Sequence, residues 1–189
     1  MGKGGSVGRL ILWNITTVDG FFEGKGPWDL PWHDLVLGED LENLSMDQLT
    51  SAAGLLFGRV TYEGMGAYWS TATGPIAELM NALPKYVVSQ TLGEARWRNS
   101  QVIRSEVRST VTGLKESLEK DLYVFGSAIL LRSLMEWNLV DEFRIGVAPY
   151  LAGSGRPLFS SGLSPQNLEL VSVRPIQKGG VLSIYRPKR

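Results

Sequence analysis

The chain of 189 residues has no cysteine and a single histidine, His33. Without cysteine it cannot form disulfide bonds, thiolate metal sites or a cysteine nucleophile, and such a composition is typical of a reducing compartment. A single histidine also excludes a site in which several histidines bind one metal ion. We therefore expect no metal site.

The sequence also lacks net charge and long hydrophobic runs. Lysine plus arginine and aspartate plus glutamate both total 19, so no overall field favours nucleic acid or an acidic membrane surface. No apolar run approaches the roughly 18 residues of a membrane helix, and residues 1–8 lack the apolar core of a signal peptide. We expect a cytoplasmic protein that binds neither nucleic acid nor membrane.

The length suits one domain that buries a substantial core. Residues 1–8, MGKGGSVG, offer little surface to pack, so they are predicted to be a disordered lead. The single domain is expected to span residues 9–189.

Short apolar runs predict the strands of an α/β fold. Those in the first two thirds of the chain are Leu10–Ile15, Leu55–Phe57, Tyr86–Val88, Val102–Ile103 and Leu122–Phe125. Ser45–Gln48 has the Ser-x-x-Gln form of a capping box, which predicts a helix running to Ala53. Helical spacing of apolar residues predicts further helices over Arg59–Met65, Pro75–Leu83, a short stretch around Leu114 and Leu118, and a stretch from Ala128. Three further strands, Phe143–Val147, Leu168–Val173 and Val181–Tyr185, have no helices between them. The expected fold is a mixed sheet of about eight strands, a parallel core with an antiparallel edge, between layers of helices.

Three of these strand ends carry polar or glycine residues. Gly58-Arg59, Ser89-Gln90 and Gly126-Ser127 each follow a buried run. Ligands of open α/β sheets bind beyond the carboxyl ends of strands, and a helix start there presents free N–H groups to a phosphate. An arginine at a helix start has the wrong charge for the helix dipole unless an anion is bound. The alternative for Gly126-Ser127 is a tight turn in which Ser127 merely caps the helix.

The segment Gly24–Gly38 is a long loop with two Pro-Trp pairs. Loops of this length are often lids or binding loops, so its tryptophans either stack on a planar substrate or fill the core. His33 is expected to be a loop residue rather than a proton donor, because the sequence shows no partner for it.

The segments together resemble the dihydrofolate reductase-like superfamily, in particular the reductase domain of the bifunctional riboflavin-biosynthesis deaminase-reductase. The resemblance runs from Arg9 to Arg186. It rests on segments that occur in family order, namely Thr17-Val18-Asp19-Gly20, LLFGRVTYE from Leu55, KYVVSQTL from Lys85, VFGSAILLRSL from Val124 and LVDEFRIGVAPYLAGSGRPLF from Leu139. It implies a dihydrofolate reductase-like three-layer α/β fold.

The resemblance also implies NADPH as cofactor. Gly58, Arg59, Val60 and Thr61 look like the segment that holds the adenosine phosphate end, and Gly126, Ser127, Ala128 and Ile129 look like the pyrophosphate turn, where Ser127 would present its N–H and its hydroxyl. Ser89, Gln90 and Thr91 fall where the family commonly has a Ser-Arg pair, so preference for NADPH over NADH would rest mainly on Arg59.

For the substrate side, the resemblance implies a pterin-like or aminopyrimidine-like ring. Asp34 follows a Pro-Trp and Leu-Pro run similar to that before the acidic residue of dihydrofolate reductases, so it is a candidate proton donor, the alternative being an exposed loop aspartate. Asp19 is expected near the nicotinamide, where it either shapes the turn or contacts the substrate. Trp28, Trp32 and Phe125 are candidate substrate-binding residues.

The favoured function is therefore an NADPH-dependent reductase of a small heterocycle, as a stand-alone domain whose physiological substrate the sequence does not identify. A non-catalytic nucleotide-binding or interaction protein on the same fold is the alternative. Resemblance to the riboflavin-type members and an apolar edge strand predict a homodimer.

Overall fold

The computed structural model describes residues 8–188, so residues 1–7 of the predicted lead lie outside the described part of the chain. Gly8 is already buried, and its N–H donates to the carbonyl oxygens of Lys115 and Leu118 at 2.9 and 3.0 Å. Within residues 8–188, no helix is long and apolar enough to cross a membrane.

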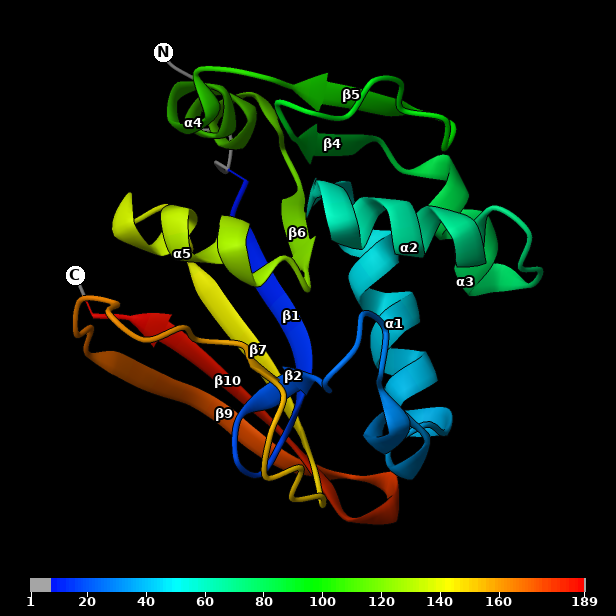
Figure 1. Cartoon of the computed structure of the whole chain (residues 1–189), viewed down its shortest axis with the longest axis vertical. Helices are drawn as coiled ribbons and strands as arrows, with labels where there is room; N and C mark the ends of the chain where they lie inside the picture. The colour runs from blue at the N-terminus through cyan, green and yellow to red at the C-terminus, as the bar shows by residue number, and fades with distance from the viewer. Residues whose placement is uncertain (1–7, 189) are drawn as a thin grey trace.

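A mixed sheet of eight strands forms the centre of the molecule, in the order β5-β4-β3-β6-β1-β7-β10-β9 (Figure 1). Its strands are β1 Leu10–Thr17, β3 Ala52–Gly58, β4 Lys85–Val88, β5 Ser100–Ile103, β6 Asp121–Phe125, β7 Glu142–Ala148, β9 Leu168–Ile176 and β10 Gly180–Pro187. The six strands from β5 to β7 pair in parallel, whereas β10 pairs antiparallel with both β7 and β9. The predicted parallel core with an antiparallel edge is confirmed.

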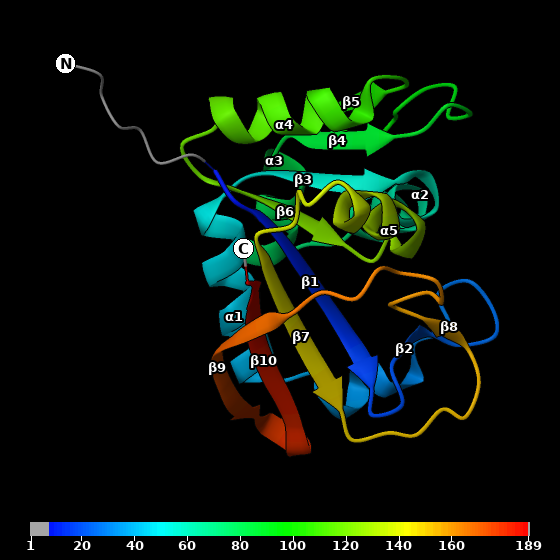
Figure 2. The same cartoon turned by 90° about the vertical axis from the view of Figure 1, so that its left-hand side faces the viewer.

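Helices cover both faces of the sheet. One face carries α1 Glu39–Ser51, α2 Arg59–Trp69 and α3 Pro75–Ala82; the other carries α4 Val107–Ser117 and α5 Ala128–Glu136, which Figure 2 turns toward the viewer. Alternate residues of a strand feed two separate cores: Ile11 and Trp13 pack on the α1 side, while Leu10 and Leu12 pack on the α5 side. The three-layer α/β prediction is confirmed.

The first helix begins earlier than predicted. It starts at Glu39 after Gly38, which provides no side-chain cap, and Ser45 lies in its middle. The Ser45 hydroxyl donates to the carbonyl oxygen of Leu41 at 2.8 Å instead of accepting an N–H at a helix start. The capping-box prediction was therefore wrong, because the acidic first turn Glu39–Glu42 suits the helix dipole without a cap.

The loop after β1 contains structure that the sequence did not reveal. Strand β2, Phe21–Glu23, pairs antiparallel with β8, Arg156–Pro157, in a separate small sheet. The 3₁₀ helix η1, Pro31–Leu35, follows within the long loop, and a second one, η2 Gln177–Gly179, joins β9 to β10. The β2–β8 pairing holds this loop against the chain after β7.

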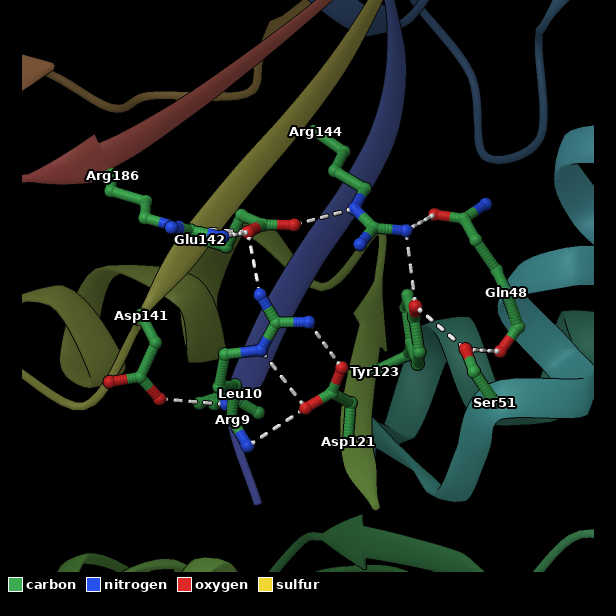
Figure 3. A network of polar contacts seen from close by, with 10 residues as sticks. All are labelled: Arg9, Leu10, Gln48, Ser51, Asp121, Tyr123, Asp141, Glu142, Arg144 and Arg186. Carbon is green, nitrogen blue, oxygen red and sulfur yellow. Dashed lines mark hydrogen bonds and ion pairs between the residues drawn. The ribbon is translucent and has the colours of Figure 1, made fainter. Parts of the chain in front are cut away.

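An ion-pair network joins the amino ends of three parallel strands (Figure 3). The buried Glu142 carboxylate contacts three arginines: Arg9 at 2.9 Å, Arg144 at 2.8 Å and Arg186 at 2.9 Å. Arg9 directly precedes β1, whereas Arg144 lies in β7 and Arg186 in β10. Arg9 also pairs with Asp121 at the start of β6 at 2.6 Å. Burial alone would raise the pKa of Glu142, but the bonds and charges of its three arginines outweigh burial and hold it below its ordinary value.

Candidate functional site

A cavity of about 520 Å³ lies at the carboxyl ends of β4, β3 and β6, beside β1. Its walls come from β1, the β2 segment and its loop, and the first turns of α2 and α5. The predicted site residues that line it are Gly58, Arg59, Val60, Thr61, Ser89, Thr91, Gly126, Ser127, Ala128, Ile129, Trp28 and Phe125. The structure therefore gathers most of the predicted cofactor segments around one space of the size of a small-molecule site.

The Gly126-Ser127 turn connects β6 to α5 through backbone in the left-handed region. Gly126 has φ +53° and Ser127 has φ +56°. A Cβ at Gly126 would lie 3.1 Å from the Thr61 side chain, so glycine suits both the backbone and the close approach. This turn is packed directly against the first turn of α2.

The hydrogen bonds of this turn differ from those predicted. Ser127 does not cap α5; its hydroxyl accepts the Gly58 N–H at 3.0 Å. The Ser127 N–H donates to Oγ1 of Thr61 at 3.0 Å, and the Gly126 N–H donates to Oδ1 of Asn14 at 2.9 Å. The prediction that Ser127 caps the helix was wrong, because the serine carries a left-handed backbone and bonds across to the end of β3.

Donors for an anion remain at the start of α5. Its first backbone bond runs from the Leu131 N–H to the Ser127 carbonyl oxygen at 2.8 Å. The N–H groups of residues 128–130 therefore have no acceptor within the helix, and α2 has the same arrangement after Gly58, which offers no side-chain cap. Two helix starts facing one cavity favour a ligand with negative charge.

Arg59, the first residue of α2, forms an ion pair with Glu63 one turn later at 2.8 Å. Both side chains are nearly half exposed. Such a pair contributes roughly 0–1 kcal/mol to stability, and the arginine-before-glutamate order is the less favourable one on a helix. The pair explains part of the unusual charge at this helix start, yet it is weak enough to open for an anionic ligand.

The turn after β4 is held by Ser89. Its buried hydroxyl accepts the N–H groups of Thr91 at 3.2 Å and Leu92 at 2.9 Å. Thr91 lines the cavity, whereas Gln90 is exposed and does not. Of the three predicted residues here, the structure brings two to the site.

The long loop brings one of its three predicted site residues to the cavity. Trp28 lines the cavity, with its indole ring on α2 where a Cβ at Gly64 would lie 1.9 Å from Cε2. Trp32 is buried in the core, stacked on Tyr150 with ring centroids 5.8 Å apart, and it does not line the cavity. Asp34 is exposed and also lies outside the cavity wall.

Asp19 holds a second loop rather than lining the cavity. Its carboxylate accepts the Thr17 hydroxyl at 2.6 Å and the N–H groups of Ala152 and Gly153 at 3.1 and 2.7 Å. The Thr17 bond is the main cause of a lowered Asp19 pKa. These contacts agree with a turn-shaping role for Asp19.

Several cavity-lining residues were absent from the predicted site, among them the polar side chains of Asn14, Glu23, His33 and Arg156. Among residues 8–188, Glu23 is the only acidic side chain in the cavity wall; it accepts the backbone N–H of Trp28 at 2.8 Å and pairs with Arg156 at 3.0 Å. Burial lowers the pKa of His33 to about 4, although the nearby Asp34 opposes the shift. A single asparagine within an apolar strand was the only sequence signal for Asn14; the other three depend on the β2–β8 pairing and the course of the loop.

Comparison with known proteins identifies the family. The family model of the RibD C-terminal domain matches residues 9–182. The chain belongs to the RibD C-terminal domain family. The YyaP protein of Bacillus subtilis (strain 168), 31% identical over 182 residues and covering 94% of each chain, is similar along almost its whole length.

Solved structures support the fold of this family member. A putative riboflavin biosynthesis protein from Shewanella sp. PV-4 superposes with a TM-score of 0.78 at 20% identity, covering 96% of this chain and 99% of that one. Dihydrofolate reductase from Enterococcus faecalis, complexed with NADP(H), gives a TM-score of 0.66 at 17% identity, with 97% and 98% covered. The expected membership of the riboflavin-type reductase-domain family is confirmed by the family model, and the solved structures show a dihydrofolate reductase-like fold.

Proposed function

We propose that this RibD C-terminal domain is an NADPH-dependent reductase of a small planar heterocycle. The observation that carries the proposal is the cavity at the carboxyl ends of β4, β3 and β6, onto which the starts of α2 and α5 converge. The cavity has a volume of about 520 Å³, and two helix starts and a glycine turn form part of its wall; both features suit a dinucleotide. The NADP(H) held by the dihydrofolate reductase neighbour supports the same reading.

The residues that would hold the cofactor follow the order of the strands. Ser89 and Thr91 after β4 would contact the adenosine end, and Arg59 would turn from Glu63 to the 2′-phosphate. The starts of α2 and α5, Gly58–Thr61 and Gly126–Ile129, would hold the pyrophosphate. Gln90, which is exposed, would contribute at most a contact at the outer rim.

When bound, NADPH supplies the hydride; the chain positions both reactants and excludes water. Trp28 from the loop and Phe125 from the end of β6 provide flat apolar surface for a pterin-like or aminopyrimidine-like ring. Trp32 would support this wall from the core through Tyr150, and Asp19 would support it through the loop at Gly153.

The proton for the reduced ring would come through water on the Glu23 side of the cavity, because Asp34 is exposed and outside the wall while Glu23 is paired with Arg156. With a substrate that is turned over, Glu23→Gln should lower kcat at least about tenfold, since the carboxylate would position the water that delivers the proton. Asp34→Asn should leave kcat within about twofold. The reverse result would return the role to Asp34.

Titration of the purified protein with NADPH and NADH tests the proposal. Wild type should bind NADPH in the micromolar range. Arg59→Ala should lower the affinity for NADPH about tenfold and leave the affinity for NADH unchanged, because only NADPH has a 2′-phosphate that loses a charge-assisted contact. Arg132→Ala is the matched control, since Arg132 forms the same kind of exposed pair with Glu136 outside the cavity. No binding of either nucleotide would overturn the proposal.

A non-catalytic nucleotide-binding protein is the second candidate. It is favoured by the acids near the cavity, because Glu23 in the wall is already paired with Arg156 at 3.0 Å and Asp34 lies outside the wall. NADPH binding without NADPH oxidation across dihydrofolate, other pterins and aminopyrimidines would support this candidate. NADPH oxidation with any of these compounds would reject it.

We also propose that the protein forms a homodimer through β9. This edge strand is exposed along residues 168–175 and has apolar side chains at Leu170, Val171 and Val173. A long apolar edge strand is normally covered, and a second copy covers it with the same surface.

A further inference from the structure

Asn14 is a buried polar side chain in the cavity wall with an unused donor. It lies on β1 and is only 8% exposed. Its Oδ1 accepts the Gly126 N–H at 2.9 Å, whereas its Nδ2 has no hydrogen-bond partner within residues 8–188. Buried side-chain donors are nearly always paired, so an unpaired one in a cavity wall points to a ligand.

The orientation of this amide follows from its neighbour. The Gly126 N–H is a donor, so the side-chain atom that faces it must be the amide oxygen. The NH₂ group is thereby directed away from Gly126 and keeps two N–H bonds to offer. The other unpaired buried side-chain atoms in the described part of the chain, on Trp32, Ser100 and Ser160, are not in the cavity wall. Asn14 is therefore distinguished by its place at the cavity.

The order of the strands indicates which part of a dinucleotide would reach Asn14. Neighbouring parallel strands lie about 4.8 Å apart, and the order here is β4, β3, β6, β1. A ligand with its adenosine at β4 and its pyrophosphate between β3 and β6 would bring its nicotinamide toward β1. Trp13 is the register partner of Phe125, the last residue of β6, so Asn14 is level with the Gly126 turn.

We propose that Asn14 is a specificity-determining residue that donates a hydrogen bond from Nδ2 to the carboxamide oxygen of the nicotinamide. This inference rests on the proposed function. The carbonyl oxygen of a carboxamide is the acceptor that the unused donor lacks. In this role Asn14 couples the Gly126 turn, through Oδ1, to the reactive end of the cofactor, through Nδ2.

Equilibrium binding to Asn14→Asp tests the inference. An aspartate retains an acceptor for the Gly126 N–H but replaces the donor by a carboxylate oxygen. We use reduced 3-acetylpyridine adenine dinucleotide phosphate beside NADPH, because its acetyl group retains the carbonyl oxygen and has no NH₂ that could turn toward the aspartate. Asn14→Asp should weaken binding of the acetylpyridine analogue by at least about tenfold, because one hydrogen bond is lost and a repulsion between two oxygen atoms is gained.

A fragment and a matched variant serve as controls. 2′,5′-ADP lacks the nicotinamide, so its affinity for Asn14→Asp should stay within about twofold of wild type. Ser100→Ala removes a buried unpaired hydroxyl outside the cavity and should change no affinity. Asn14→Leu lacks both the amide oxygen and the NH₂ group, so it should also lower the affinity for NADPH. It should still bind 2′,5′-ADP, and that retained binding shows that the variant is folded.

The outcomes separate this inference from the proposed function. If wild type binds neither NADPH nor 2′,5′-ADP, the proposed function fails and takes this inference with it. If wild type binds NADPH and its acetylpyridine analogue but Asn14→Asp and Asn14→Leu bind both equally well, the inference alone is overturned. Equal weakening of 2′,5′-ADP would also overturn it, because the effect would then lie in the turn and not at the nicotinamide.

Discussion

His33 illustrates how the fold changes the chemistry of a single residue. In the sequence it is an isolated loop histidine, whereas the fold buries most of it in the cavity wall, and burial lowers its pKa to about 4. The imidazole is therefore neutral near pH 7, where it can form a hydrogen bond but is a poor proton donor. This agrees with the expectation that it is not the catalytic acid.

The lowered pKa predicts how stability depends on pH. The unfolded chain binds a proton at His33 below about pH 6.5, and the folded protein binds it only below about pH 4, so stability falls as pH falls between these values. His33→Gln should remove this part of the dependence, on the order of 1–3 kcal/mol between pH 7 and pH 4. Urea unfolding of both proteins across that range measures the difference; parallel curves would contradict the lowered pKa.

At the scale of elements, hydrogen bonds between strand ends organise both edges of the sheet. At the carboxyl edge, Thr61, Ser127 and Asn14 connect α2, the α5 turn and β1 around the cavity. At the amino edge, Glu142 and its arginines connect β1, β7 and β10 (Figure 3). The strand ends at the cavity are joined to one another by neutral hydrogen bonds, whereas those at the amino edge are joined by ion pairs.

Glu142→Gln should destabilise the protein by about 2–4 kcal/mol, because it removes a buried charge shared by three arginines. Arg9 and Arg186 are partly exposed, which places the loss below that of a fully buried pair. Urea unfolding at pH 7 measures it, and Glu136→Gln, which breaks the exposed pair with Arg132, should cost no more than about 1 kcal/mol. Equal losses for the two variants would show that the network contributes little.

At the scale of the whole molecule, the antiparallel edge is the surface that the monomer leaves uncovered. Val173 and Leu170 are 57% and 52% exposed on β9, and a register shift beside Tyr185 bends the strand at Val171. Edge bulges often limit pairing with other strands, so the homodimer would pack through side chains rather than extend the sheet.

Sedimentation at micromolar concentration should show a dimer for wild type. Val173→Lys or Leu170→Lys should shift it to a monomer, because a lysine at the centre of an apolar interface would be desolvated. Leu151→Lys is the control, since Leu151 is 72% exposed in a loop outside β9. A monomeric wild type would reject the dimer.

Much of the fold could be predicted because a buried strand or helix requires apolar residues at a characteristic local spacing. Runs such as Leu10–Ile15 and Leu55–Phe57 are buried on both faces, and Pro75 opens a helix as its fixed φ predicts. Boundaries that lack a side-chain signal were missed, as at Gly38 before α1. The β2–β8 pair was missed because two or three residues joined across more than 130 positions leave no periodicity.

The sequence by itself determined the order of the main-sheet strands and of the α-helices, the family, and the segments Gly58–Thr61 and Gly126–Ile129 that meet at the cavity. Only the tertiary structure decided that Asp34 and Gln90 are exposed while Asn14, Glu23 and His33 line the wall. The physical reason is that strand ends are placed by sheet register, which hydrophobic patterns encode, whereas a loop side chain is placed by long-range pairing. A residue's partner, such as the Gly126 N–H for Asn14, is 112 positions away and invisible to any local pattern.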